Sequence, residues 1–251
     1  MTEKVYLYGK NPLKEAILAK KRDGVQRIER LYVTKKSEAD AEMMSLIQSN
    51  NLAYDVVTKE EIESMVGRES VNQGVCALLY TSALYTDLDT VLEKSKEKKG
   101  NSLFILLDKL EDPHNVGAII RSAVAFGADA ILMPEYEQAQ ISGSVIKSAS
   151  GMNFAIPIVR IGNINTTLKQ LQEKRFWVYG LTGEGDTKLE KVTFDSDAVI
   201  VIGSEGEGIR KKTLEYCDFR LSINTSALCE SLNASNATAV TLYEWNKQQN
   251  A

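Results

Sequence analysis

Three polar stretches of this sequence carry side chains of the kinds that bind ligands and move protons. The first contains Asn115 and Arg121, and the second contains Glu205 in a loop of glycines. The third, Ser222–Ala237, is rich in serine and asparagine. Carboxylates and amides orient polar ligands or exchange protons, and a guanidinium holds phosphate. These groups are suited to binding polar ligands.

The first stretch follows an apolar run and continues into a predicted helix. Pro113 requires an extended approach, and Asn115 is expected to cap the helix. Gly117 and Arg121 are four residues apart and share a face, so a phosphate can approach the glycine while the guanidinium holds it. A capped helix with a surface arginine is the alternative. His114, the single histidine, is interpreted as a hydrogen-bonded packing group and not as a general base.

The second stretch, Val199–Arg210, is a predicted buried strand that runs into a loop with three glycines. Glu205 and Glu207 stand where a phosphate-binding loop would carry no acid. The loop is therefore unsuited to a dinucleotide pyrophosphate and better suited to hydroxyls, amino groups or a cationic sulfonium. A solvated turn is the alternative interpretation.

The third stretch has a composition that is unfavourable inside a helix. Serine and asparagine side chains compete with the helix for backbone hydrogen bonds, whereas they are favourable at helix starts and around polar ligands. A helix cap would explain Ser231 alone but not the whole run. The stretch therefore predicts a helix start that also contacts a ligand.

Strands and helices alternate through the second half of the chain. The apolar run 103–107 predicts a strand buried on both faces. Strands separated by helices imply an α/β fold with a mostly parallel sheet, which binds ligands where its strands end. The predicted strands are 103–107, 130–133, 156–159, 176–181, 198–202 and 219–223, and the predicted helices are 115–126, 143–150, 164–174 and 232–247.

The first part of the chain predicts a smaller α/β domain. Its predicted strands are 28–33, 54–57 and 75–80, with helices at 39–49 and 59–66 and another after the turn at Gly9–Pro12. Residues 81–101 are predicted to be a short helix and a solvated linker, because the tract 93–101 alternates in charge. The predicted domains are 1–80 and 102–251, joined by the linker 81–101.

Composition limits the classes of protein that fit. The chain has 251 residues, 43% hydrophobic and 25% charged, as in ordinary globular proteins. Three distant cysteines and one histidine argue against a disulfide framework or a zinc site, so a reduced cytoplasm and no metal are expected. The start lacks the pattern of a secretory signal, and no apolar run reaches the roughly 20 residues of a membrane span.

The net charge of −4 is unusual for a protein that binds nucleic acid, but the charge is unevenly distributed. Residues 20–36 carry five more positive than negative charges. That excess suits several phosphate contacts, and a solvated helix end followed by a loop is the alternative.

The three stretches resemble the signature motifs of a known family. Asn115–Ser122, Ile202–Ile209 and Ser231–Ala237 are similar, in order and spacing, to the motifs of the SpoU, or TrmH-like, branch of the SPOUT RNA methyltransferases. Tyr8–Pro12 and Asn72–Val75 resemble the small L30e-like RNA substrate-binding domain of the 23S rRNA guanosine 2′-O-methyltransferase (RlmB) subgroup. The resemblance implies S-adenosylmethionine-dependent methylation of a ribose 2′-hydroxyl in structured RNA, with a 23S rRNA guanosine as the expected target.

The resemblance also implies a fold and a set of site residues. The C-terminal SPOUT domain is expected to carry a deep trefoil knot and to form a homodimer with the active site near the interface. S-adenosylmethionine is expected in the knot, held by the loops after Leu181, Ile202 and Ile223. The residues at the family's catalytic positions are Asn115, Arg121, Glu205, Ser231 and Asn233, and those at its cofactor positions are Thr182, Gly203, Ile223 and Leu232.

The family pattern does not carry over fully at Arg121 and at Asn224-Thr225. The family mechanism makes the arginine a base, but a guanidinium is not deprotonated in proteins. We therefore expect Arg121 to hold a substrate phosphate and stabilise the developing alkoxide, oriented by Glu205 and Asn115. Many relatives have Pro-Met where this chain has Asn224-Thr225, so the shape of the adenine pocket is expected to differ.

Three other functions fit part of the sequence. A tRNA 2′-O-methyltransferase would use the same motifs on another RNA. A non-catalytic RNA-binding or ribosome-assembly factor would keep the fold but bind no S-adenosylmethionine. A nucleotide-binding oxidoreductase is disfavoured, because no GxGxxG follows the first strand of the second domain and because Glu205–Glu207 is acidic.

Overall fold

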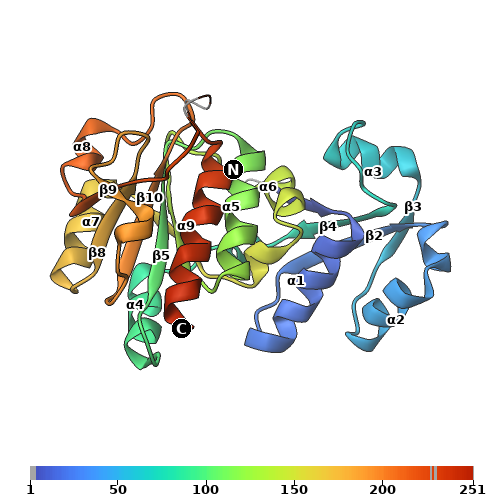
Figure 1. The fold of residues 1–251 in the computed structure, drawn as a ribbon. Coiled ribbons are helices and arrows are strands. Elements are labelled where there is room, and N and C mark those ends of the chain that lie inside the picture. Colours follow the sequence, from blue (N-terminus) through green and yellow to red (C-terminus); the bar gives the residue numbers. More distant parts are fainter. Residues whose placement is uncertain (1–3, 227, 229–230, 251) are drawn as a thin grey trace. The chain divides into compact units, whose positions relative to one another are not determined.

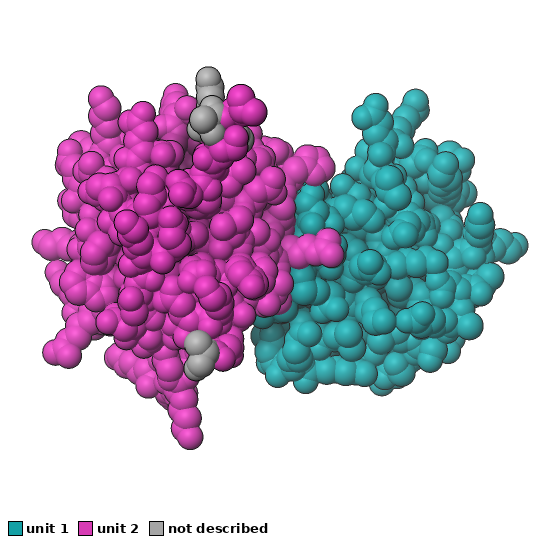
Figure 2. All heavy atoms as spheres, viewed as in Figure 1, with its two compact units in different colours: residues 1–85, 141–155 teal, residues 86–140, 156–251 magenta. Residues whose placement is uncertain are grey.

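The computed structural model describes residues 4–226, 228 and 231–250, which form two compact units. Unit 1 comprises the residues up to Tyr85 together with Ile141–Ala155, and unit 2 comprises Thr86–Gln140 together with the chain from Ile156 onward (Figure 2). Each unit has its own sheet with helices packed against it (Figure 1). The α/β fold predicted from the sequence is confirmed.

Unit 2 is built on a seven-stranded sheet in which all neighbouring strands pair in parallel. The strand order is β7-β6-β5-β10-β8-β11-β9. The strands are β5 (Leu103–Asp108), β6 (Ala130–Pro134), β7 (Ile158–Ile161), β8 (Trp177–Leu181), β9 (Thr187–Lys188), β10 (Ala198–Gly203) and β11 (Phe219–Ser222), and the α-helices are α4 (Leu88–Glu97), α5 (Pro113–Ala125), α7 (Ile164–Glu173), α8 (Lys211–Leu214) and α9 (Ala234–Gln249).

The apolar strands of unit 2 form its core because helices cover both faces of the sheet. Every residue of β5 and β10 is buried, as the continuous apolar runs predicted. Side chains of α4 and α7 share one cluster with alternate residues of the strands, among them Phe104 and Val199. Helices α5 and α9 pack against each other, and α9 contacts β10 (Figure 1).

The strand order positions the loops that matter for function. β10 lies between β5 and β8, and β11 lies beside β8. Because all four strands are parallel, their carboxyl ends meet at one edge of the sheet. The loops after 108, 181, 203 and 222 therefore come together although the sequence separates them.

Unit 1 has a four-stranded mixed sheet of order β1-β4-β2-β3. Helix α1 ends at Gly24, whose φ of 75° is left-handed, and α3 begins with a capping box between Thr58 and Glu61. The elements are β1 (Val5–Tyr8), α1 (Lys10–Asp23), β2 (Ile28–Thr34), α2 (Ala41–Ser49), β3 (Asp55–Val57), α3 (Lys59–Val66), β4 (Val75–Leu79) and α6 (Gly143–Ser148), with 3-10 turns at Ser37–Ala39, Thr81–Ala83 and Met152–Phe154.

The segment 141–155 belongs to unit 1, although the sequence analysis included it in the predicted domain 102–251. Helix α6 packs on β1, and a Cβ added to Gly143 would lie 2.4 Å from the carbonyl oxygen of Tyr6. Only glycine allows so close an approach. A local pattern indicates that a helix forms but not which sheet it covers, so the sequence alone does not assign this helix.

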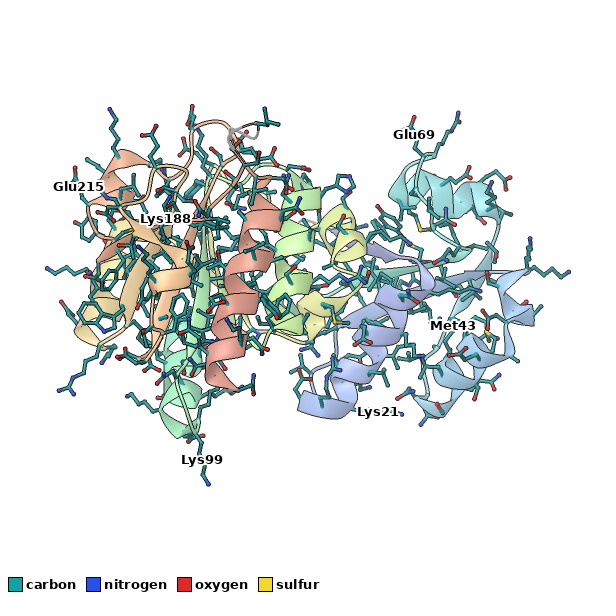
Figure 3. The ribbon with its side chains drawn as sticks, viewed as in Figure 1. Lys21, Met43, Glu69, Lys99, Lys188 and Glu215 are labelled. Atoms are coloured by element: carbon teal, nitrogen blue, oxygen red, sulfur yellow. The ribbon has the colours of Figure 1, made fainter. Side chains whose placement is uncertain are left out.

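The segment 81–101, predicted to connect two domains, contains more packed structure than a linker would. Helix α4 begins at Leu88 and buries Val91 and Leu92 in the core of unit 2. The polar tract that follows is exposed, and Lys99 extends away from the unit (Figure 3). No helix among the described residues is long and apolar enough to cross a membrane.

The start of α5 differs from the sequence prediction. The helix begins at Pro113, and the Asp112 side chain caps it by accepting a hydrogen bond from the backbone N–H of His114, at 2.9 Å. The prediction that Asn115 caps the helix is therefore wrong. Asn115 lies inside the first turn, where its buried side chain is available for contacts with other loops.

Candidate functional site

A cavity of about 500 Å³ lies at the carboxyl edge of the sheet in unit 2. The loops after β8, β10 and β11 and the start of α9 form its walls. Residues predicted to contact the cofactor or to take part in catalysis come together here, and those that line the cavity are Thr182, Gly203, Glu205, Ile223, Ser231 and Leu232.

A second cavity, of about 310 Å³, lies beside the first. Its walls are Lys109–Asp112, Asn115 and the turn Ser204–Glu207. That turn also lines the first cavity, so Glu205 and Glu207 face both. One acidic turn thus borders two adjoining spaces, in which two ligands can be held close together.

The acidic turn is closed on itself by backbone hydrogen bonds. The N–H of Ser204 donates to the carbonyl of Gly208 at 3.2 Å, and the N–H of Gly208 donates back at 3.0 Å. A Cβ on Gly203 would lie 2.2 Å from the backbone of Gly208 and Ile209, so only glycine fits there. The three glycines noted in the sequence are thus part of a tight hairpin that presents Glu205.

Two amide side chains from distant parts of the chain meet at Glu205. The amide Nδ2 of Asn115 donates to Glu205 Oε1 at 2.7 Å, and Asn233 Nδ2 donates to the same oxygen and, at 3.0 Å, to Asn115 Oδ1. Asn233 Oδ1 accepts from the backbone N–H of Ser235 at 2.9 Å, so the same residue caps α9. We call Asn115, Glu205 and Asn233 the amide–carboxylate cluster. It joins all three predicted motifs.

Arg121 does not line either of these two cavities. It follows Asn115 by six residues on α5, which places it about 240° further around the helix. Its side chain is exposed. The structure therefore brings Asn115, Glu205, Ser231 and Asn233 together, whereas Arg121 is not among the described residues that line the two cavities. That Asn115 and Glu205 orient Arg121 stays a prediction.

The structure adds Asp108 and Arg210, which the sequence analysis did not single out. Asp108 is fully buried at the end of β5 and pairs in register with Gly203 of β10. Its carboxylate accepts from Arg210 Nε at 2.7 Å and from the backbone N–H of Arg210 at 3.1 Å. Arg210 Nη1 also donates to Glu137 Oε2 at 3.0 Å. This contact fixes the acidic turn to β5. The sequence does carry a signal for Asp108, which is an acidic residue at the end of an otherwise apolar strand. A carboxylate buried in this way needs a partner.

Lys109, the next residue, also pairs with the acidic turn. Its Nζ lies 2.9 Å from Glu207 Oε2. The Lys109 ammonium lowers the pKa of Glu207 from its ordinary value, and the carboxylate raises the pKa of Lys109. Both groups are therefore charged at neutral pH.

The electrostatics of the first cavity favour a cation over a phosphate. Glu184, Glu205 and Glu207 line it, and no lysine or arginine does among the described residues. Ile223 and Thr225 form part of its wall. Ala227, Cys229 and Glu230 of the third stretch lie outside the described residues.

Comparison with protein families finds two matches that together cover most of the chain. The SpoU rRNA Methylase family matches residues 102–243. The family described as RNA 2′-O ribose methyltransferase substrate binding matches residues 6–82.

Two curated relatives align over nearly the whole chain. An uncharacterized tRNA/rRNA methyltransferase of Synechocystis is 32% identical over 97% of this chain, which spans 62% of that longer relative. A putative TrmH family tRNA/rRNA methyltransferase of Staphylococcus haemolyticus is 30% identical, with 96% of this chain and 95% of the relative covered.

Solved structures share the fold. The SpoU methyltransferase AviRb from Streptomyces viridochromogenes, solved in complex with AdoMet, has a TM-score of 0.84 at 22% identity and covers 99% of this chain and 91% of that one. A putative TrmH family RNA methyltransferase from Porphyromonas gingivalis has a TM-score of 0.76 at 23% identity, covering 98% and 90%.

Proposed function

Because this chain belongs to the SpoU rRNA methylase family, we propose that it methylates a ribose 2′-hydroxyl of structured RNA. The observation that carries the proposal is the amide–carboxylate cluster between two adjoining cavities. S-adenosylmethionine is the cofactor, and when bound it supplies a methyl group activated by a sulfonium cation.

The first cavity fits S-adenosylmethionine. Its volume of about 500 Å³ lies within the range of small-molecule sites. Gly203 leaves room for the close approach of the hairpin, and the acidic lining suits a cation. Thr182, Gly203, Ile223 and Leu232 would hold the cofactor. The second cavity, on the other side of the turn, would take the acceptor nucleotide.

The amide–carboxylate cluster would orient the acceptor hydroxyl. Two amides donate to Glu205 Oε1 and fix the plane of the carboxylate. A carboxylate offers about four acceptor positions, so Glu205 retains the capacity to accept a hydrogen bond from a ribose hydroxyl. Ser231 lines the first cavity, which Glu205 also lines, and would add a hydroxyl contact there. These residues thereby favour the loss of the hydroxyl proton as the methyl group is transferred.

Arg121 would complete the site from a second copy of the chain. Helix α9 exposes Val240 and Tyr243, at 43% and 57%, and it packs beside α5, which carries Arg121. An exposed apolar surface of this kind suits a homodimer interface. In a homodimer the guanidinium of one protomer would hold a substrate phosphate and stabilise developing negative charge at the partner's site.

The expected substrate is a guanosine of 23S rRNA in the cytoplasm, as for the RlmB subgroup, with tRNA as the alternative. The match of residues 6–82 to a substrate-binding family supports an RNA-binding role for unit 1. Within the basic stretch 20–36, Arg27 pairs with Asp23 and Arg22 with Glu15, so part of that charge is already balanced.

Mapping ribose methylation in total RNA tests the proposal. RNA from cells with and without the gene should differ at one 2′-O-methylated nucleotide or a small set of them. Purified protein should restore that mark on RNA from the deletion strain with S-adenosylmethionine. An identical pattern in both strains would contradict the proposal, and a restored mark in tRNA would favour the alternative substrate.

Calorimetry separates an enzyme from a non-catalytic RNA-binding relative. We expect S-adenosylmethionine to bind purified protein with one site per chain. A chain that binds RNA but gives no heat with S-adenosylmethionine would be the non-catalytic factor.

Asp108→Asn should weaken cofactor binding. The substitution replaces a buried carboxylate oxygen that accepts from Arg210 with an amide that donates, so the acidic turn loses its fixed contact with β5. We expect about tenfold weaker S-adenosylmethionine binding by calorimetry and a loss of about 2 kcal/mol in unfolding free energy. Glu137→Gln is the control, because that exposed pair contributes little. Unchanged affinity in Asp108→Asn would show that the turn needs no such contact.

A further inference from the structure

Lys109 has an unusual backbone conformation at the edge of the second cavity. Its φ of +62° lies in the left-handed region, which residues with side chains rarely adopt. It directly follows β5 and lines the cavity with Asn115 and Glu205. Residues other than glycine keep such conformations where the surrounding structure holds them, and these positions are concentrated at functional sites.

Lys109 is also the one positively charged residue among the described residues that line the two cavities. The other charged residues there are acids, namely Glu111, Asp112, Glu184, Glu205 and Glu207. An RNA backbone approaching this surface meets repulsion unless a cation is placed to receive a phosphate. Lys109 is placed where such a contact is needed.

Glu207 currently accepts the hydrogen bond that Lys109 would give to a phosphate. The side chain of Glu207 is 71% exposed and that of Lys109 is 30% exposed. An ion pair with such an exposed partner is weakened by solvent and salt. A phosphate oxygen offers an equally strong charge-assisted acceptor, so it can replace Glu207 without breaking any buried contact.

We propose that Lys109 binds an RNA phosphate next to the methylated nucleotide, and that Glu207 occupies Lys109 until this phosphate displaces it. The inference rests on the proposed RNA methylation. It assigns Lys109 a binding role at the acceptor cavity and makes Glu207 an intramolecular competitor. When RNA binds, a phosphate therefore replaces the Glu207 carboxylate as the partner of Lys109.

The test uses Lys109→Gly in the full-length protein, with tritiated S-adenosylmethionine and total RNA from a strain lacking the gene. Glycine accepts a φ of +62° without strain, so thermal stability should be unchanged or higher. The apparent KM for RNA should rise about fivefold. The slope of log(kcat/KM) against log salt should become shallower by about 0.7 to 0.9, the value of one phosphate contact. S-adenosylmethionine affinity should stay within about twofold, and Lys109→Arg should keep the wild-type slope.

Arg175→Gly is the matched control. Arg175 is exposed and basic and has a left-handed φ of 70°, but it precedes β8 at the edge of the sheet opposite the cavities. It should keep the RNA KM and the salt slope of the wild type. Glu207→Gln, which removes the competitor, should lower the apparent RNA KM about two- to threefold.

Two results would overturn the inference. The first is that the wild type methylates this RNA and Lys109→Gly has the same RNA KM and the same salt slope. That result would leave the proposed function standing. The other is an equal loss in Arg175→Gly, which would attribute the effect to general surface charge.

Discussion

Glu205→Ala is expected to lower the turnover of RNA methylation by about a hundredfold or more, the usual contribution of a positioned proton-transfer group. Glu205 Oε1 is the shared acceptor of the Asn115 and Asn233 amides. Without it the hydroxyl loses its acceptor, and the buried Asn115 amide loses a partner at a cost of about 1 to 3 kcal/mol. Steady-state methyl transfer and thermal unfolding measure the two effects.

Two further variants separate a catalytic role of Glu205 from a structural one. Glu205→Gln keeps an oxygen for the amides but removes the charge, so we expect it to recover stability while turnover stays low. Glu215→Ala, on an exposed side chain that points away from unit 2 just after α8, should match the wild type in both measurements (Figure 3). If Glu205→Ala kept more than half of the wild-type turnover, Glu205 would have no role in the reaction.

Arg121→Ala is the second substitution with a large expected effect, and it should be rescued by a partner subunit. Alone, it should lose about a hundredfold or more in kcat/KM, because the developing charge loses its cation. Mixed with Glu205→Ala, it should regain activity. In each mixed dimer one site receives an intact Glu205 from its own chain and an intact Arg121 from the other.

Co-expression of the two variants with different tags allows the mixed dimer to be isolated. Its activity should be about half that of the wild type, since one of two equivalent sites is complete. Arg121→Lys tests the planar guanidinium, and near-normal turnover in it would show that a point charge suffices. If the mixed dimer were no more active than either variant alone, Arg121 would act in the site of its own chain. A monomeric wild-type protein would also contradict the proposal that Arg121 acts at the partner's site.

The sequence by itself determined the motifs and most of the elements, although it gave no prediction for β1 or β9. Continuous apolar runs identified β5 and β10, because strands buried on both faces carry apolar side chains on both. The composition of the three polar stretches predicted ligand-binding loops at strand ends, and all three do line the two cavities. These features are local, so local residue patterns encode them.

The start of α5 shows where local patterns give the wrong detail. Asp112 and Asn115 are both good helix caps, and Asn115 was the residue predicted to cap the helix. The structure uses Asp112, because Asn115 is needed inside the helix as a donor to Glu205, 90 residues away in sequence. A preference of one residue type does not reveal a competing partner from another part of the chain.

Only the tertiary structure decided which of these groups meet. The contacts Asp108–Arg210 and Lys109–Glu207 join the ends of β5 and β10, which are neighbours in the sheet but distant in sequence. The contacts of Asn115 and Asn233 with Glu205 also need α5 and α9 to pack side by side. The strand order that creates them, with β10 between β5 and β8, leaves no trace in local periodicity. For the same reason the sequence did not indicate that 141–155 joins unit 1. Residue types determined the available chemistry, and the packing of strands determined which groups share a site.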